Sequence, residues 1–188
     1  MTIQEMKKEL ARILWEKSYM EGDFTLSSGL KSDYYFDGRQ TSLHPQGAWL
    51  IGNLFVDMLK GMNIAGVAGM TMGADPLITA TSLAARAQGL SWPGLIVRKE
   101  AKKHGTGRSL EGMANFKAGD CVGMLEDVVS TGGSVIRACE SVRASGLVVR
   151  DVVCVLDREM GGREALRQVG CGLHAIFTRA ELVSLAQA

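Results

Sequence analysis

Hydrophobic and polar residues follow a helical period in the first part of the chain. Thr2 and Glu5 have the spacing of a capping box, and apolar residues then recur at helical intervals through Leu14, which predicts an amphipathic N-terminal helix. Pro45 suits a first helical turn and precedes a second predicted helix over Ala48–Leu59. The chain is therefore expected to begin with two helices, separated by a segment rich in glycine, serine and aromatic residues.

From residue 64 onward, short apolar runs without helical period are separated by helical patterns. The runs predict strands at Ile64–Gly69, Gly94–Val97, Val122–Leu125, Val152–Leu156 and His174–Thr178. The helices predicted around them are Pro76–Gln88, Val135–Ala144, a short helix after Gly161 and a last helix from Arg179. Strands separated by helices favour right-handed βαβ units, so we expect an α/β fold with a central, mostly parallel sheet flanked by helices. Ligands of such sheets bind at the carboxyl ends of the strands.

Length and charge narrow the class of protein. A chain of 188 residues is large enough for one domain with its own core. The net charge of +1 argues against a broad nucleic-acid surface, because binding the phosphate backbone requires a strong basic excess. The four cysteines form no Cys-x-x-Cys pair, so buried reduced thiols of a cytoplasmic protein are expected. The sequence shows no signal-type apolar core and no stretch near the ~20 apolar residues that span a bilayer.

The stretch from Cys121 to Ser134 places an apolar strand before two acids and a turn rich in glycine and hydroxyl groups. Ser130–Ser134 offers backbone N–H groups just before a predicted helix, whose dipole also favours a bound anion. Glu126 and Asp127 would repel that anion, so their useful partners are hydroxyl groups or a bridging metal. A phosphate beside a diol, as in ribose 5-phosphate, satisfies both halves. The alternative is a βα turn with a Ser/Thr cap and solvated acids.

A strongly basic segment follows the strand that ends at Val97. It extends to Arg108 and contains five Lys or Arg side chains together with His104. Glycines interrupt it, and a long cationic loop with glycine hinges can close over a polyanion and then release it. Its charge suits a diphosphate better than a single phosphate. The alternative is a solvated surface loop.

Two further segments suit a flat, anionic base. Phe24–Asp37 gathers aromatic residues beside serines and glycine, which offers a stacking wall and donors for ring oxygens. The alternative for these aromatic residues is an ordinary place in the core. Arg158 follows a predicted strand and can make bidentate hydrogen bonds to a carboxylate or to paired carbonyls. A salt bridge to Asp157 or Glu159 is the alternative for this arginine.

Taken together, these segments resemble one known family. Val122–Ser134 is similar to the 5-phosphoribosyl 1-diphosphate (PRPP) signature of the type I phosphoribosyltransferases, with a hydrophobic strand, two acids, two apolar residues and Ser-Thr-Gly-Gly-Ser. Arg98–Gly105 resembles the catalytic loop of the orotate phosphoribosyltransferases, and Phe24–Phe36 resembles their base-binding hood. The resemblance implies the type I phosphoribosyltransferase fold in a single domain, 1–188. We expect a hood of about 1–44 plus 161–188, a core of about 45–160 and a flexible catalytic loop of about 98–115.

The resemblance implies Mg²⁺-dependent transfer of the ribose 5-phosphate group from PRPP to orotate, giving orotidine 5′-monophosphate and diphosphate in pyrimidine (UMP) biosynthesis. It implies catalytic roles for Lys102, His104 and Asp127. The residues implied in PRPP binding are Arg98, Lys99, Lys102, His104, Glu126, Asp127, Val128, Val129, Ser130, Thr131, Gly132, Gly133 and Ser134. Those implied in orotate binding are Tyr35, Phe36, Ser130 and Arg158. Mg²⁺ would be held mainly through PRPP and water, so no residue is assigned to it directly.

The resemblance also implies a cytoplasmic homodimer in which each catalytic loop reaches the neighbouring subunit's active site. The chain departs from the family pattern at two places. Many members carry a lysine where Ser27 stands and a Tyr-Lys pair where Met72 and Gly73 stand, so the PRPP contacts of those lysines are unassigned here. Three alternatives stay open, namely a phosphoribosyltransferase for another base, a PRPP- or nucleotide-sensing regulator that touches RNA or DNA, and a non-catalytic subunit.

Overall fold

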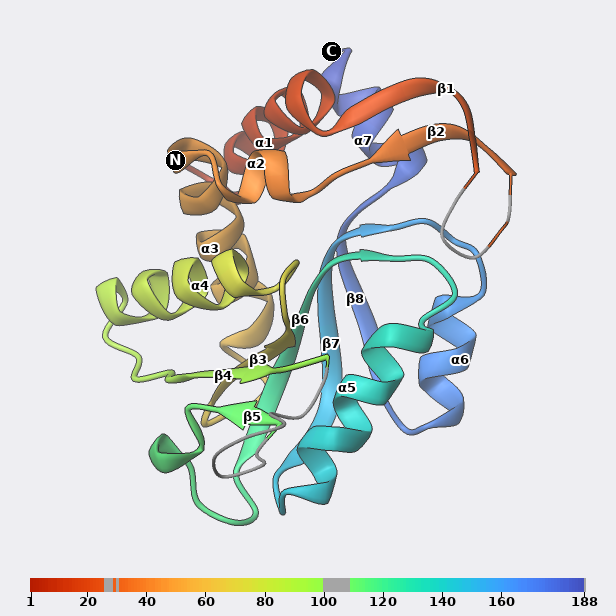
Figure 1. Cartoon of the computed structure of the whole chain (residues 1–188). Coiled ribbons are helices and arrows are strands. Elements are labelled where there is room, and N and C mark those ends of the chain that lie inside the picture. The colour runs from red at the N-terminus through yellow and green to blue at the C-terminus, as the bar shows by residue number, and fades with distance from the viewer. Residues whose placement is uncertain (26–28, 30, 100–108, 188) are drawn as a thin grey trace.

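The computed structural model describes residues 1–25, 29, 31–99 and 109–187 and has an α/β architecture around a six-stranded sheet (Figure 1). The strand order is β5-β4-β3-β6-β7-β8. These strands are β3 (Gly66–Met70), β4 (Gly94–Val97), β5 (Leu110–Glu111), β6 (Cys121–Val129), β7 (Val148–Asp157) and β8 (Gly172–Thr178). All neighbours pair in parallel except the short edge strand β5, which is antiparallel to β4. The expected mostly parallel sheet is therefore confirmed.

Helices cover both faces of this sheet. The helices of the described residues are α1 (Ile3–Lys17), α2 (Arg39–Ser42), α3 (Pro45–Leu59), α4 (Asp75–Ala87), α5 (Gly133–Ala144), α6 (Gly162–Gln168) and α7 (Arg179–Ala186), together with a 3₁₀ turn, η1 (Met113–Asn115). Figure 1 shows α3 and α4 on one face and α5 and α6 on the other. Buried side chains accordingly form two clusters, one around Phe55 and Phe177 and one around Met124 and Val135. None of the helices in the described part of the chain is both long and apolar enough to cross a bilayer.

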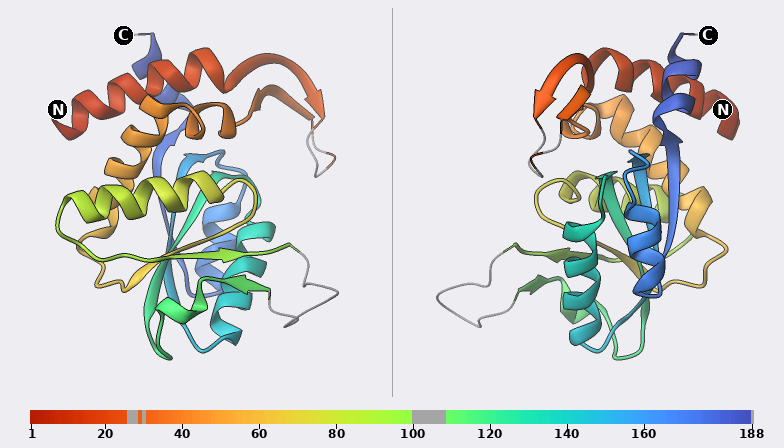
Figure 2. Two further views of the ribbon diagram at one scale, coloured as in Figure 1. Left: turned by 60° about the vertical axis from the view of Figure 1, so that its left-hand side comes forward. Right: turned by 90° about the vertical axis from the view of Figure 1, so that its right-hand side faces the viewer.

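A smaller layer lies beyond the carboxyl ends of the parallel strands. β1 (Tyr19–Thr25) and β2 (Lys31–Phe36) form an antiparallel hairpin that extends from α1 over this end of the sheet (Figure 2). α7 packs against α1, and we call α1, α2, α7 and the hairpin the hood. The sequence pattern did not predict the hairpin, because most of β1 is exposed and its pairing with β2 is irregular between Glu21 and Phe24.

Three predicted boundaries need correction. The range 161–188 belongs to the hood only through α7, because β8 is an edge strand of the main sheet and α6 packs against it. The predicted loop over 98–115 ends in β5 and η1, and Arg98 N donates to Ser109 O at 2.8 Å. The strand predicted at Val122–Leu125 continues through both acids, because its pairing with β7 extends to Val129.

Other local predictions are confirmed. The Thr2 hydroxyl accepts from Glu5 N, and the Glu5 carboxylate accepts from Thr2 N at 2.7 Å, which completes the capping box. The strand Gly94–Val97 has its predicted bounds, and α3 begins at Pro45. The four cysteines are free thiols, although Cys121 is only partly buried.

Candidate active site

A cavity of about 270 Å³ lies where the hood meets the carboxyl ends of the strands. The hood contributes residues 35–37 and 39, and the end of β3 with the loop after it contributes residues 70–73. The rest of the lining comes from Lys99, Glu126, Asp127 and Ser134. Segments far apart in the sequence therefore meet at the edge of the sheet where ligands of α/β proteins bind.

The two adjacent acids at the end of β6 have unusual protonation equilibria. Glu126 is 8% exposed, and burial together with the charge of Asp127 raises its pKa well above the ordinary value, while Lys99 acts in the opposite direction. Burial also raises the pKa of Asp127, although hydrogen bonds from Glu126 and from Val128 N, at 2.8 Å, oppose this. In both carboxyl groups, burial favours the neutral form over the ionised form. Neutral hydroxyl groups or a nearby cation would favour the ionised form.

The turn after β6 leads directly into the start of α5. Gly132 occupies the cap position with φ of +84°, and no side chain of the described residues caps this helix. The predicted alternative of a Ser/Thr cap is therefore wrong. The turn is stabilised by a backbone hydrogen bond, since Gly162 N donates to Ser130 O at 2.9 Å. Uncapped N–H groups at a helix start are suited to a phosphate, and Ser134 brings this end of the turn to the cavity.

The side chains around this turn differ in what they can offer a ligand. Thr131 is exposed and Ser130 is partly buried. Val129 is 1% exposed and packs in the core, so only its backbone could contact a ligand. Val128 is partly buried, and its N–H is already bound to Asp127.

Arg158 connects the core to the hood. Its Nη2 donates to Ser32 Oγ at 2.7 Å, and its guanidinium carbon lies 4.2 Å from the centroid of the Tyr34 ring. Its Nε is buried without a hydrogen-bond partner among the described residues. Asp157 instead pairs with Arg163, at 3.0 Å, so the alternative of an Asp157–Arg158 salt bridge is not what the structure has. Arg158 thus keeps an unsatisfied donor, but this side chain does not line the cavity, and a bound anion would reach the buried Nε only after the contacts with the hood shift.

The aromatic residues predicted for base binding have different environments. Tyr35 is 36% exposed and Phe36 is 5% exposed, yet both line the cavity. Phe36 also belongs to the core cluster that contains Phe55, so the alternative of a core aromatic describes it in part. Tyr35 contacts Phe24, with ring centroids 5.6 Å apart. The cavity therefore has an aromatic wall on the hood side.

The predicted cationic residues are placed only in part. Lys99 lines the cavity, whereas Arg98 lines a neighbouring one beside Thr71 and donates to Glu111 Oε1 at 3.3 Å. Lys102 and His104 lie outside the described residues.

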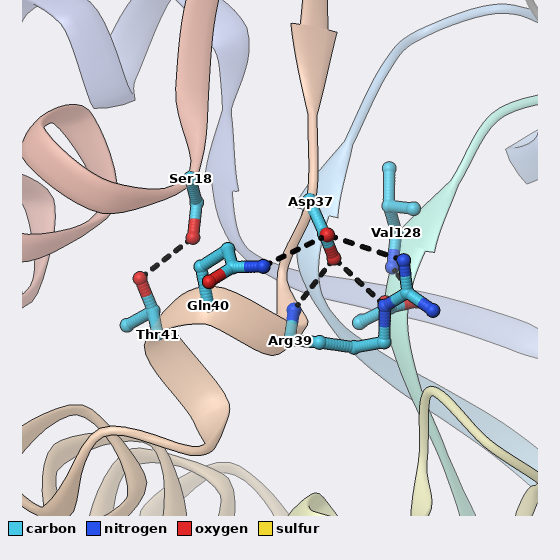
Figure 3. A network of polar contacts seen from close by, with 7 residues as sticks. Ser18, Asp37, Arg39, Gln40, Thr41 and Val128 are labelled. Carbon is cyan, nitrogen blue, oxygen red and sulfur yellow. Dashed lines mark hydrogen bonds and ion pairs between the residues drawn. The ribbon is translucent and has the colours of Figure 1, made fainter.

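Sequence reasoning missed one ion pair at the cavity. Asp37 and Arg39 both line it, and Arg39 Nε donates to Asp37 Oδ1 at 2.8 Å (Figure 3). The only signal was their position directly after the aromatic hood residues.

Comparison with known proteins gives relatives along almost the whole chain. The orotate phosphoribosyltransferase of Nostoc sp. is 44% identical over 180 residues, which cover 96% of this chain and 86% of that protein. The crystal structure of the Mycobacterium tuberculosis H37Rv orotate phosphoribosyltransferase in complex with Fe(III) dicitrate has a TM-score of 0.81 and 35% identity, over 94% of this chain and 98% of that one. The structure of the same enzyme in complex with PRPP has a TM-score of 0.78 and 31% identity, over 95% and 99% of the two chains.

No protein-family model matches the chain. The identity to a curated relative nevertheless extends over nearly all of both proteins, and the solved structures share the same arrangement of sheet and helices. The chain therefore belongs to the orotate phosphoribosyltransferase family and has the type I phosphoribosyltransferase fold.

Proposed function

We propose that this protein transfers the 5-phosphoribosyl group of PRPP to orotate, giving orotidine 5′-monophosphate and diphosphate in pyrimidine (UMP) biosynthesis. One observation carries this proposal. A single cavity joins the aromatic residues of the hood, the loop after β3, the acid pair of β6 and the start of α5. These are the parts that a base, a diphosphate, a ribose and a 5-phosphate each require.

The substrates are placed by the chemistry of each wall. The turn over 130–134 receives the 5-phosphate at the uncapped start of α5, and Glu126 and Asp127 accept from the ribose hydroxyl groups. Orotate lies against Tyr35 and Phe36, with its carboxylate and carbonyl groups bound by Arg158 and the Ser130 hydroxyl. The diphosphate is bound by Arg98, Lys99, Lys102 and His104.

The reaction exchanges one bond at the anomeric carbon of the ribose. The bond from this carbon to the diphosphate oxygen breaks with its electron pair, and a ring nitrogen of orotate forms the new bond. Positive charge develops on the sugar as the diphosphate leaves, so ionised Glu126 and Asp127 stabilise the transition state while the cations stabilise the leaving group. The ring nitrogen of orotate that bonds to the sugar loses its proton, which the departing diphosphate or water accepts. Because orotate is an anion with an acidic ring N–H, this step requires neither a strong base nor a covalent nucleophile.

Mg²⁺ is the proposed cofactor. Among the described residues there is no group of three or more His, Cys, Asp or Glu side chains that could hold a metal ion. The acid pair of β6 nevertheless offers oxygen ligands, which Mg²⁺ prefers, and the ion usually keeps water and substrate phosphates as its other ligands. These residues thus fit a Mg²⁺ ion that binds together with PRPP. The ion would neutralise negative charge on the diphosphate. The free state of the four cysteines supports a reducing compartment, the cytoplasm.

The protein is further proposed to act as a homodimer whose catalytic loop serves the neighbouring active site. Large apolar side chains are exposed on α3 and α4, with Trp49 48% and Leu83 67% exposed. Trp49 and Leu83 line a groove between α3 and α4. Exposed apolar residues that lie close together are typical of protein interfaces, and a second copy would cover this face.

A base-competition assay tests the substrate assignment. The protein is incubated with PRPP, Mg²⁺ and an equimolar mixture of orotate, uracil and adenine, and the product nucleotides are separated. We expect orotidine 5′-monophosphate to dominate. Another nucleotide as the main product would assign the protein to a different base. PRPP binding without any product, or a mobility shift of RNA or DNA at physiological salt, would support a non-catalytic subunit or a regulator instead.

A further inference from the structure

Arg39 is a cation of the active-site cavity with a fixed orientation. Its Nε and Nη2 donate to the two carboxylate oxygens of Asp37, at 2.8 and 3.1 Å. Gln40 Nε2 donates to the same carboxylate at 3.3 Å, and Figure 3 shows these contacts at the start of α2. A bidentate pair fixes the plane of the guanidinium group, so Arg39 is oriented before any ligand binds.

The guanidinium group of Arg39 keeps donors for a ligand. A guanidinium group has five N–H donors, and the bonds to Asp37 use two of them. Among the described residues, Asp37 is the hydrogen-bond partner of this side chain, which remains 43% exposed. Because Arg39 lines the cavity, its remaining N–H donors are available to a ligand bound there.

The wall formed by the loop after β3 carries no cation of its own. Its residues 71–73 are Thr, Met and Gly. A Cβ atom built on Gly73 would lie 3.1 Å from both carboxylate oxygens of Asp127, so the loop backbone passes close to this acid. Arg39 acts on the same acid from the hood side. Burial raises the pKa of Asp127, and the positive charge of Arg39 lowers it. Arg39 and the loop therefore lie near the same acid, from two sides of the cavity.

The charges of the cavity indicate which ligand group Arg39 meets. The 5-phosphate has its own donors at the start of α5, and the ribose hydroxyl groups have the acid pair. Lys99 and Arg39 are the cations among the described lining residues, and the diphosphate is the most anionic part of PRPP. We propose that Arg39 binds the diphosphate group of PRPP and that Asp37 positions it. This inference depends on the proposed function.

Calorimetric titration of two ligands tests the role of Arg39. Inorganic diphosphate with Mg²⁺ probes the proposed contact, and orotidine 5′-monophosphate probes the same site without a diphosphate. Arg39→Gln should weaken diphosphate binding about 10- to 100-fold, because it removes charge-assisted hydrogen bonds, and should leave nucleotide binding within about twofold. Arg39→Lys and Asp37→Asn should give smaller losses for diphosphate alone. Arg167→Gln, which breaks an exposed pair with Glu164, is the matched control and should change neither affinity.

The possible outcomes separate this inference from the proposed function. Unchanged diphosphate affinity in Arg39→Gln, or an equal loss for both ligands, would overturn the role of Arg39. If Arg39→Gln does not fold, Arg39→Lys and Asp37→Asn make the same comparison, and unchanged diphosphate affinity in both would overturn it equally. Turnover of orotate by the wild-type protein is measured alongside. Its absence would contradict the proposed function, whereas the diphosphate titration would still decide whether Arg39 binds this group.

Discussion

The guanidinium carbon of Arg158 lies 4.2 Å from the centroid of the Tyr34 ring, which holds a side chain from the end of β7 against the hood. The same guanidinium group donates to Ser32 Oγ at 2.7 Å. Two hood residues thus orient the arginine that is proposed to bind orotate.

Removing this guanidinium group should affect orotate and spare PRPP. Arg158→Gln should raise the KM for orotate about 10- to 100-fold, because a charge-assisted hydrogen bond to the substrate is lost. The KM for PRPP should stay within about twofold. Initial rates with each substrate varied in turn measure both constants, and an equal rise in the two would contradict the assignment of Arg158 to orotate.

Substituting the residues that orient Arg158 should raise the KM for orotate less than Arg158→Gln does. Ser32→Ala and Tyr34→Leu should each raise the KM for orotate several-fold, through the loss of a hydrogen bond or a cation–π contact. Tyr34→Phe is the matched comparison, because it keeps the ring over Arg158 and removes only the hydroxyl. Tyr34→Phe should leave the KM unchanged. A loss as large as that in Tyr34→Leu would show that the hydroxyl, not the ring, matters.

Glu126 should destabilise the folded protein at neutral pH. Its pKa is raised in the folded state by burial, so above the ordinary carboxyl pKa the folded state binds more protons than the unfolded state, and stability falls as the pH rises. Glu126→Gln should therefore increase the free energy of unfolding at pH 7.5, and this gain should shrink as the pH falls towards the ordinary carboxyl pKa. Denaturant unfolding at several pH values measures it. The same change should lower kcat/KM about 100-fold.

Glu140→Gln provides the control for this pH dependence, because Glu140 lies on the exposed face of α5. This variant should leave both stability and turnover unchanged. A stability gain in Glu126→Gln that is independent of pH would mean that its cause is packing and not the buried charge.

Gly162 should be intolerant of a side chain because it supports the phosphate turn. A Cβ atom at this position would lie 2.5 Å from Ser130 O, which is closer than real Cβ contacts. Gly162→Ala should lower the free energy of unfolding by about 1 to 3 kcal/mol and weaken ribose 5-phosphate binding. Gly61→Ala has nothing within 4 Å of the new atom and serves as the control. Equal stability and phosphate affinity in the two variants would contradict this role.

The proposed sharing of active sites can be tested by mixing two inactive variants. Lys102→Ala alters the catalytic loop and Glu126→Gln alters the acid pair. If the loop serves the neighbouring subunit, each mixed dimer contains one intact site, and an equimolar mixture should recover about a quarter of the wild-type activity. No recovery after subunit exchange, confirmed by native mass spectrometry, would place the loop over its own active site.

The sequence predicted most of the main sheet because its strands are short apolar runs bounded by polar residues. Gly94–Val97 is a clear example, and the acid pair could be placed at a strand end because it follows such a run. The β1–β2 hairpin was missed because β1 is mostly exposed and has no clear alternation. Its arrangement depends on packing between segments distant in the chain.

Contacts between side chains that are distant in the chain could not be predicted from the sequence for the same reason. Arg158 could be recognised as a candidate from its place after a strand, but its contact with Ser32 depends on how the hood folds back over the core. Likewise, no spacing pattern relates Arg39 to Asp127, because β6 and α2 meet only in the folded protein. Gly162 had no chemical signal, since its role is to leave room for Ser130 O.

The most direct test follows orotate absorbance with PRPP and Mg²⁺ present and quantifies the released diphosphate in the same reaction. We predict loss of orotate with one diphosphate released per orotidine 5′-monophosphate formed, and no comparable rate after Mg²⁺ is chelated. Folded protein that leaves orotate unchanged, but consumes PRPP with another base, would contradict the assignment of this active site to orotate.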